Sequence, residues 1–340
     1  FVPFLEDLRD RAMGSWAIGE DRYRALLAER ELLDHGPAEV AARGRAAFDE
    51  LEAEMEAVAA RIDGGAGWRE VRAGLAADHP PTPEAMRAEY AEWVARARQF
   101  LVGTDLVSLP DGEGCLVEPS PPFARSVDAV ASYRAPPPFT ASRTGHFFVP
   151  YPADGMNDDE VRNRLASNAR PAMPTVTAHE AYPGHHWHHA MVAGNPRPLR
   201  RVLGTPFFWE GWALYAEAVM AEHGFFTDPR HRLCHLEARA FRAVRMVVDT
   251  GLHTGEMGFD EAVDHLSAHT SVTGATARAE VGRYCQRPTQ AVSYLTGALE
   301  IGRIRRRWEA EERGSLRQFH DALAGSGSLP PALAAAAVLT

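Results

Sequence analysis

The stretch "HEAYPGHHWHH", residues 179–189, contains five histidines and one glutamate. His179 followed by Glu180 is the start of the zinc-hydrolase pattern H-E-x-x-H, in which two histidines one helical turn apart bind the metal and the glutamate acts as general base. The second histidine of that pattern would stand at position 183, where this chain has Pro183. The segment is therefore either a metal site with altered spacing or a polar turn rich in histidine.

The spacing decides which histidines can share one metal ion. On an unbroken helix His186 would lie about 10.5 Å from His179 along the axis, too far for one zinc. Pro183 and Gly184 disfavour a regular helix, so we predict a bulge that loops out two residues and returns His185 to the face of His179. His186 is the substitute ligand if the bulge is longer, and otherwise a supporting neighbour.

The last two histidines of the stretch have no clear role. We expect His188 and His189 to face solvent or to support the site, because one zinc has no room for them. His185 and His189 also form an i, i+4 pair and are thus a rival ligand set. That rival leaves Glu180 outside its usual relation to the ligands.

A third ligand is expected on the segment "TPFFWEGWALYAEAVM", which begins at residue 205. Glu210 and Glu217 are seven residues apart and share a helix face, among aromatic residues that indicate burial. Buried carboxylates need a partner or a metal. We predict Glu210 as the third zinc ligand and Glu217 as a neighbour that orients a ligand histidine. A solvated helix face is the alternative for both.

Two further segments could complete an active site. Arg242, Arg245, Asp249 and His253 form a polar stripe on a helix otherwise rich in Ala, Val and Met. His253 could stabilise an oxyanion, whereas Arg245 with Asp249 is also an ordinary salt-bridge spacing. We predict Asp249 as a supporting residue and both arginines as candidates to bind a substrate carboxylate.

The segment "RYCQRPTQAVSY" carries the remaining candidates. Tyr294 is the second candidate for stabilising an oxyanion. Arg283, Tyr284 and Gln290 are predicted to bind substrate. Each of these side chains, taken alone, is as readily explained as a packed core residue.

The elements that must position these residues are mainly helices. Residues 1–105 carry apolar side chains at three- and four-residue spacings and are predicted to be helical. Residues 106–155 contain clustered prolines and short β-prone runs, which predict a small antiparallel insert of edge-type strands, or alternatively a wrapping loop. An edge strand there could pair with a peptide main chain. Helices return over 156–340, and we predict one domain over residues 1–340 with a central cleft.

Composition excludes several classes of function. The net charge of −10 disfavours nucleic acid and anionic membranes as partners. The chain contains no lysine, which removes Schiff-base chemistry, and its three cysteines are too scattered for a disulfide framework. With no apolar run long enough to span a bilayer, we expect a cytoplasmic protein, although any targeting segment upstream of Phe1 would not be seen.

Four motifs, taken in order, resemble a known family. They are "HEAYPGHH", "EGWALYAE", "RMVVDTGLH" and "RYCQRPTQAVSYLTG", and they resemble the bacterial family of unknown function 885 (DUF885), which is regarded as similar to gluzincin-type zinc metallopeptidases. The resemblance covers nearly the whole chain and implies a helical, cleft-containing fold with one zinc held by His179, His185 and Glu210. The family often has Gln where this chain has His188 or His189.

The sequence thus predicts a zinc-dependent hydrolase acting on a peptide or amide bond of a small substrate, with Glu180 as general base. A second hypothesis is a zinc enzyme that acts on a non-peptide metabolite. A third is a non-catalytic protein in which the five histidines bind more than one metal. The oligomeric state is not predicted.

Overall fold

The computed structural model of the chain describes residues 1–126, 130–140, 142–272 and 274–340. It is mainly helical with one small sheet, as the sequence predicted. The N-terminal part contains five α-helices: α1 (Val2–Arg11), α2 (Glu20–Ala25), α3 (Pro37–Ile62), α4 (Trp68–Gly74) and α5 (Pro83–Thr104). Proline at the first turn starts α3 and α5, and the Thr82 hydroxyl caps α5 by accepting from the Ala85 amide at 3.1 Å.

The sheet follows, and one prediction about it is wrong. Its strands are β1 (Glu113–Pro119), β2 (Ser132–Arg134) and β3 (Arg143–Val149), in the order β1-β3-β2. We expected an antiparallel sheet, but β1 runs parallel to β3 and only β2 is antiparallel to it. More than twenty residues separate β1 from β3, enough for the crossover that a parallel pair requires.

The C-terminal part is helical, as predicted for residues 156–340. The segment with the predicted bulge after His179 is two helices rather than one. The bounds are α6 (Asp158–Ala166), α7 (Met173–Glu180), α8 (His185–Ala193), α9 (Pro198–Val202), α10 (Pro206–Glu222), α11 (Pro229–Thr254), α12 (Phe259–His269), α13 (Gly274–Gln286), α14 (Ser293–Ala310), α15 (Leu316–Gly325) and α16 (Pro331–Leu339).

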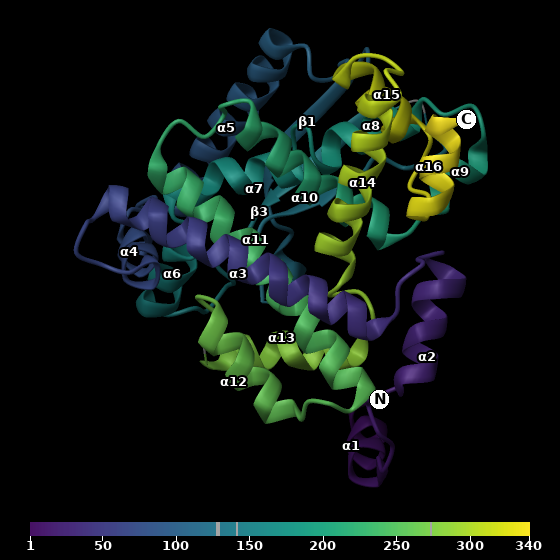
Figure 1. Cartoon of the computed structure of the whole chain (residues 1–340). Helices are drawn as coiled ribbons and strands as arrows, with labels where there is room; N and C mark the ends of the chain where they lie inside the picture. The colour runs from purple at the N-terminus through teal and green to yellow at the C-terminus, as the bar shows by residue number, and fades with distance from the viewer. Residues whose placement is uncertain (127–129, 141, 273) are drawn as a thin grey trace.

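Two helix pairs organise the core. The long helices α3 and α11 lie along one another (Figure 1), and at their closest approach a Cβ on Gly44 would meet the Ala243 carbonyl oxygen at 2.8 Å. Helix α10, which carries Glu210 and Glu217, packs on α14. Most residues of α10 and α11 are buried. Some polar side chains on these two helices, such as Glu217 and Asp249, are therefore in the interior.

The crossing of α10 and α14 depends on a pair of glycines, Gly211 and Gly297. A Cβ at position 297 would lie 1.9 Å from the Phe207 carbonyl oxygen. Gly297→Ala is therefore expected to lower the free energy of unfolding by about 3 kcal/mol through overpacking. Urea denaturation measures this, and Gly282→Ala, where a Cβ meets nothing within 4 Å, is the matched control. Equal stability of the two variants would contradict the close crossing.

None of the helices in the described part of the chain is both long enough and apolar enough to cross a bilayer.

Candidate metal centre

The candidate ligands lie on either side of a break between α7 and α8. Helix α7 ends at Glu180, and Ala181 leaves helical geometry with φ −111° and ψ −88°. The peptide bond before Pro183 is cis, and the Trp212 indole donates to the Pro183 carbonyl at 2.8 Å. His185 then begins α8. The predicted bulge is thus a complete interruption, because the Pro-Gly segment makes no helical turn of its own.

Gly184 allows the two helix ends to come together. A Cβ at this position would lie 1.8 Å from the carbonyl oxygen of His179, so a larger residue would push α8 away from α7. As a result the imidazole rings of His179 and His185 have centroids only 4.8 Å apart and are nearly perpendicular, at 87°. The break brings His185, and not His186, beside His179.

Glu210 completes a three-residue donor set. Its Oε2 lies 3.6 Å from His179 Nε2 and 3.4 Å from His185 Nε2. Tetrahedral zinc, with bonds of 2.0–2.2 Å to nitrogen and oxygen, places neighbouring ligand atoms about 3.4 Å apart. Two imidazole nitrogens and one carboxylate oxygen at this spacing are the ligand set of a catalytic zinc site. The residues present therefore fit the predicted metal.

Glu180 lies beside this set without a partner of its own. Ligand atoms of His179, Glu180 and His185 all lie within 4.8 Å of one another. Glu180 nevertheless makes no hydrogen bond or ion pair with any described residue, and burial raises its pKa. Glu210 Oε2 is closer than the Glu180 carboxylate to both imidazoles, so Glu210 is the better candidate for the third ligand. The oxygens of Glu180 then remain free to accept a proton.

A buried carboxylate holds the far side of His179. Glu217 Oε1 lies 2.7 Å from His179 Nδ1, which turns Nε2 of that ring towards Glu210. The other oxygen, Oε2, lies 3.4 Å from Nδ1 of His235 on α11. Although burial alone would raise the pKa of Glu217, His179 and His235 hold it at about 2. The sequence reasoning missed His235, because no local motif marks it.

The electrostatics of the cluster favour a cation. Burial opposes the charged form of His179, yet Glu210 and Glu217 raise its pKa to about 10. The two imidazoles hold the pKa of Glu210 well below its usual range despite burial. Three carboxylates, including that of Glu180, thus face two ligand histidines, and a bound divalent cation would balance this negative charge.

A cavity of about 730 Å³ opens on the donor set. Tyr294 lines it, and its ring is stacked on His179 with centroids 6.3 Å apart and planes at 19°. Arg242 also lines the cavity and donates to the Ala238 carbonyl at 3.1 Å, but it forms no ion pair with a described carboxylate. Of the predicted substrate-binding residues, Arg242 is therefore the one that a substrate carboxylate can reach without displacing another acid.

The remaining predicted substrate-binding residues surround Glu280, which the sequence reasoning missed. Arg245, Arg283 and Tyr284 all donate to Glu280 Oε2, at 2.8, 2.9 and 2.8 Å. The same three groups lower the pKa of Glu280 to about 2, although burial opposes this. Arg245 thus pairs with Glu280 and not with Asp249 as its spacing suggested. Only Arg245 and Glu280 of this network line the cavity.

Gln290 connects this network to Tyr294. Its Oε1 accepts from Arg283 at 2.5 Å, and its Nε2 lies 3.4 Å from the Tyr294 hydroxyl. Arg283, Tyr284 and Gln290 do not themselves line the cavity. Their contacts indicate that they position Arg245 and Tyr294, rather than touch a substrate as we predicted.

His253 and Asp249 do not line the metal cavity, so neither has the role there that the sequence predicted. His253 is completely buried, with Nε2 3.1 Å from the Tyr284 carbonyl and its ring against Tyr23. It has no path to an oxyanion in the metal cavity. Asp249 accepts from the Tyr23 hydroxyl at 2.6 Å and from the Thr289 amide at 3.1 Å. The polar stripe on α11 therefore serves two regions. Arg242 and Arg245 line the metal cavity, whereas Asp249 and His253 pack against Tyr23 in the N-terminal part.

The other histidines of the motif have separate environments. His186 has Nε2 2.8 Å from Glu113 and Nδ1 3.2 Å from the Tyr133 hydroxyl, so neither nitrogen is free for the metal. His188 is completely buried, neither nitrogen has a partner, and burial lowers its pKa strongly. A solvent-facing His188 was therefore a wrong prediction. His189 lines the metal cavity, stacked on Tyr133.

These contacts make a prediction for His186. His186→Ala is expected to retain zinc at the wild-type stoichiometry but to lose about 3 kcal/mol of unfolding free energy, because buried Glu113 loses a charge-assisted hydrogen bond. Metal analysis and urea denaturation measure the two effects. His185→Ala is the comparison, for which we expect the reverse pattern. Loss of zinc from the His186 variant alone would show that His186 is the ligand.

Solved structures share this fold. One, described as "the putative lipoprotein from Colwellia psychrerythraea", is similar with a TM-score of 0.86 and 24% identity over 98% of this chain and 58% of that one. Another, "a putative lipoprotein of unknown function from Shewanella oneidensis", has a TM-score of 0.86 and 20% identity over 99% and 63%. The chain thus spans less than two thirds of either neighbour.

The sequence comparisons agree with the resemblance found in the motifs. No curated protein matches the chain. The model of a family described as "Bacterial protein of unknown function (DUF885)" matches residues 1–338. Because that match extends over nearly the full length, the chain belongs to the DUF885 family of bacterial proteins.

Proposed function

We propose that the chain is a zinc-dependent hydrolase of the gluzincin type that cleaves a peptide or amide bond of a small substrate. The observation that carries the proposal is the convergence of His179 Nε2, His185 Nε2 and Glu210 Oε2 at the ligand spacing of one zinc, beside an unpartnered Glu180. When bound there, zinc would supply Lewis-acid chemistry that activates water and polarises a carbonyl group.

The residues of the chain would perform the proton transfers and the positioning. Glu180 takes the proton of the attacking water and returns it to the leaving amine. The Tyr294 hydroxyl, held by Gln290, donates to the developing oxyanion. Arg242 binds a substrate carboxylate, which favours short peptides or N-acyl amino acids with a free carboxyl group.

The position of β2 supports a peptide as the substrate. In the order β1-β3-β2 this strand is at the edge of the sheet, and Ser132 and Tyr133 of β2 line the metal cavity. An extended peptide can pair with the free main-chain groups of such an edge. This favours the strand alternative over a wrapping loop.

A non-catalytic metal store is disfavoured by the surroundings of the histidines. That hypothesis requires the five histidines to act together as ligands. Both nitrogens of His186 already contact Glu113 and Tyr133, and His188 packs against Phe208. Of the five histidines, only His179 and His185 share a carboxylate oxygen of a described residue in the manner of ligands.

Metal analysis of the purified protein, followed by a screen of short peptides and N-acyl amides, tests the proposal. We expect one zinc per chain and turnover of compounds with a free carboxyl group. One zinc without turnover of any peptide or amide would favour the hypothesis of a zinc enzyme that acts on a non-peptide metabolite. More than one tightly bound metal per chain would favour the hypothesis of a non-catalytic metal store.

The cellular location is a separate proposal. The two solved neighbours are named lipoproteins, and lipoproteins are held at a membrane surface by a lipid anchor. We therefore infer a location outside the cytoplasm, in place of the cytoplasmic one predicted from the sequence. Fractionation of cells that produce the natural protein tests the location. Recovery of the protein with the cytoplasmic fraction would overturn this inference.

A further inference from the structure

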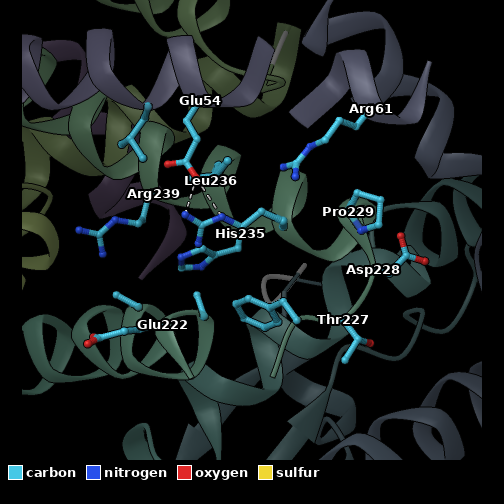
Figure 2. Close-up of a pocket in the computed structure, with 14 residues that line it drawn as sticks. Glu54, Arg61, Glu222, Thr227, Asp228, Pro229, His235, Leu236 and Arg239 are labelled. Carbon is cyan, nitrogen blue, oxygen red and sulfur yellow. Dashed lines mark hydrogen bonds and ion pairs between the residues drawn. The ribbon is translucent and has the colours of Figure 1, made fainter. Parts of the chain in front are cut away.

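A second cavity of about 580 Å³ lies in the groove between α3 and α11, with the end of α10 as its floor (Figure 2). Its volume is in the range of small-molecule sites. None of the three candidate metal ligands lines it, and neither does Glu180. Glu217 separates the two cavities, because it lines the metal cavity while its neighbour His235 lines this one.

Helix α11 presents two arginines and a histidine to this cavity. Arg232, His235 and Arg239 follow at spacings of three and four residues and share one face of the helix. Arg232 forms an ion pair with Glu54, 2.5 Å away. Arg239 forms no ion pair with a described carboxylate and donates to the Leu214 carbonyl at 3.4 Å. Burial lowers the pKa of Arg239, although the charges of Glu217 and Glu54 oppose this.

The acids that line the cavity are already neutralised. Glu222 is held by both guanidinium nitrogens of Arg305, at 2.7 and 2.8 Å. Asp228 is paired with Arg230 at 2.7 Å. Arg61, at the other end of the groove in Figure 2, also lacks an ion pair with any described residue. The cavity therefore has an excess of positive charge.

His235 lies beside Arg239 but adds no donor for an anion. Its side chain is 1% exposed, its Nδ1 lies 3.4 Å from Glu217 Oε2, and burial lowers its pKa. With Nδ1 turned to a carboxylate, Nε2 of the neutral ring can only accept a hydrogen bond. The anionic group of a ligand is therefore assigned to Arg239.

The rest of the wall is apolar. Leu51, Phe226, Pro229 and Leu236 line the cavity together with two alanines of α10. Such a surface suits hydrocarbon rather than a fully hydrated ion. The cavity thus combines a positively charged end with an apolar wall.

We propose that this cavity binds a small organic anion, with its carboxylate or phosphate group on Arg239 and its hydrocarbon part against Leu51 and Phe226. Arginine holds both kinds of group by paired hydrogen bonds. The site goes beyond the proposed hydrolase function and does not depend on it, because the binding can be measured on protein freed of metal.

Isothermal titration calorimetry of the metal-free full chain carrying Arg242→Gln tests the proposal, because this substitution removes the arginine to which the proposed function assigns a substrate carboxylate. The probes are hexanoate and hexyl phosphate, with acetate and inorganic phosphate as the head groups alone. We expect one anion per chain, with affinity rising about fourfold for each methylene that is buried. The tighter of the two hexyl compounds identifies the head group. No binding of either at millimolar concentration would overturn the proposal.

Variants locate the binding. Arg239→Gln is expected to weaken binding by about 10- to 100-fold, through loss of a charged hydrogen bond. Arg45→Gln, which changes an exposed arginine of α3 that lines neither cavity, is the matched control in the same background and should bind as tightly as the parent. Equal affinity of the two variants would refute the proposal.

A second variant tests the site without changing Arg239, in case the Arg239 variant does not fold. Leu51 is partly exposed on the cavity wall, so Leu51→Glu adds a negative charge there without removing a buried contact of Arg239. We expect it to weaken hexanoate and hexyl phosphate binding at least tenfold at low salt. Wild-type affinity in this variant would contradict the proposed position of the ligand.

Discussion

Glu210→Ala is expected to abolish stoichiometric zinc binding. Loss of an outer-shell partner typically lowers metal affinity about 10- to 100-fold, and loss of a ligand should exceed this. Without Glu210 the site retains only the imidazoles of His179 and His185, one ligand fewer than catalytic zinc sites provide. Competition with a chelating indicator dye measures the affinity, and circular dichroism shows whether the variant is folded.

Two further variants on α10 provide reference values for the loss of zinc affinity. Glu217→Ala should weaken zinc by the smaller, outer-shell amount, because Glu217 contacts His179 through Nδ1 only. Glu222→Ala removes a surface ion pair with Arg305 and should leave zinc affinity unchanged. If Glu210→Ala bound zinc as tightly as Glu222→Ala, the third ligand would have to be Glu180.

Glu180→Gln is expected to retain one zinc and to lose about 10²- to 10⁴-fold in kcat, the usual contribution of a general base. Glutamine occupies the same volume and can still hydrogen-bond to water, but it cannot accept the proton. Glu180 has no structural partner among the described residues, so the substitution should leave stability nearly unchanged. Metal content and turnover of the best substrate from the peptide screen are measured on the same preparation.

Glu237→Gln is the matched control for that experiment. Glu237 also lines the metal cavity, but it accepts from the Ser271 hydroxyl at 2.7 Å and is 3.7 Å from Arg72. Its substitution should reduce kcat little. Full turnover by Glu180→Gln, or an equal loss in both variants, would remove Glu180 from the role of base.

Much of the site was predictable because it depends on local sequence. Helix starts are marked by residues such as Thr82, Thr205 and Asp228, each followed by proline at the first helical position. The pairing of Glu210 with the histidine motif followed from the rule that buried carboxylates need partners. These inferences require only periodicity, capping and residue chemistry within a few turns of helix.

The incorrect predictions all concern contacts between distant segments. The parallel pairing of β1 with β3 depends on the path of the intervening chain. The preference for His185 over the alternative His186 likewise depends on Glu113, which lies 73 residues before His186. His253 is buried against Tyr23, and the stripe pattern on α11 carries no sign of that residue.

The sequence by itself thus determined the helical character, the family and the residue types of the proposed zinc site. The tertiary structure decided how the helix breaks at Pro183 and Gly184, and which of two adjacent histidines turns towards Glu210. It also assigned Arg245 to Glu280. The physical reason is that one step along a helix rotates a side chain by about 100°, so that only the packing around α7, α8 and α10 distinguishes His185 from its neighbour.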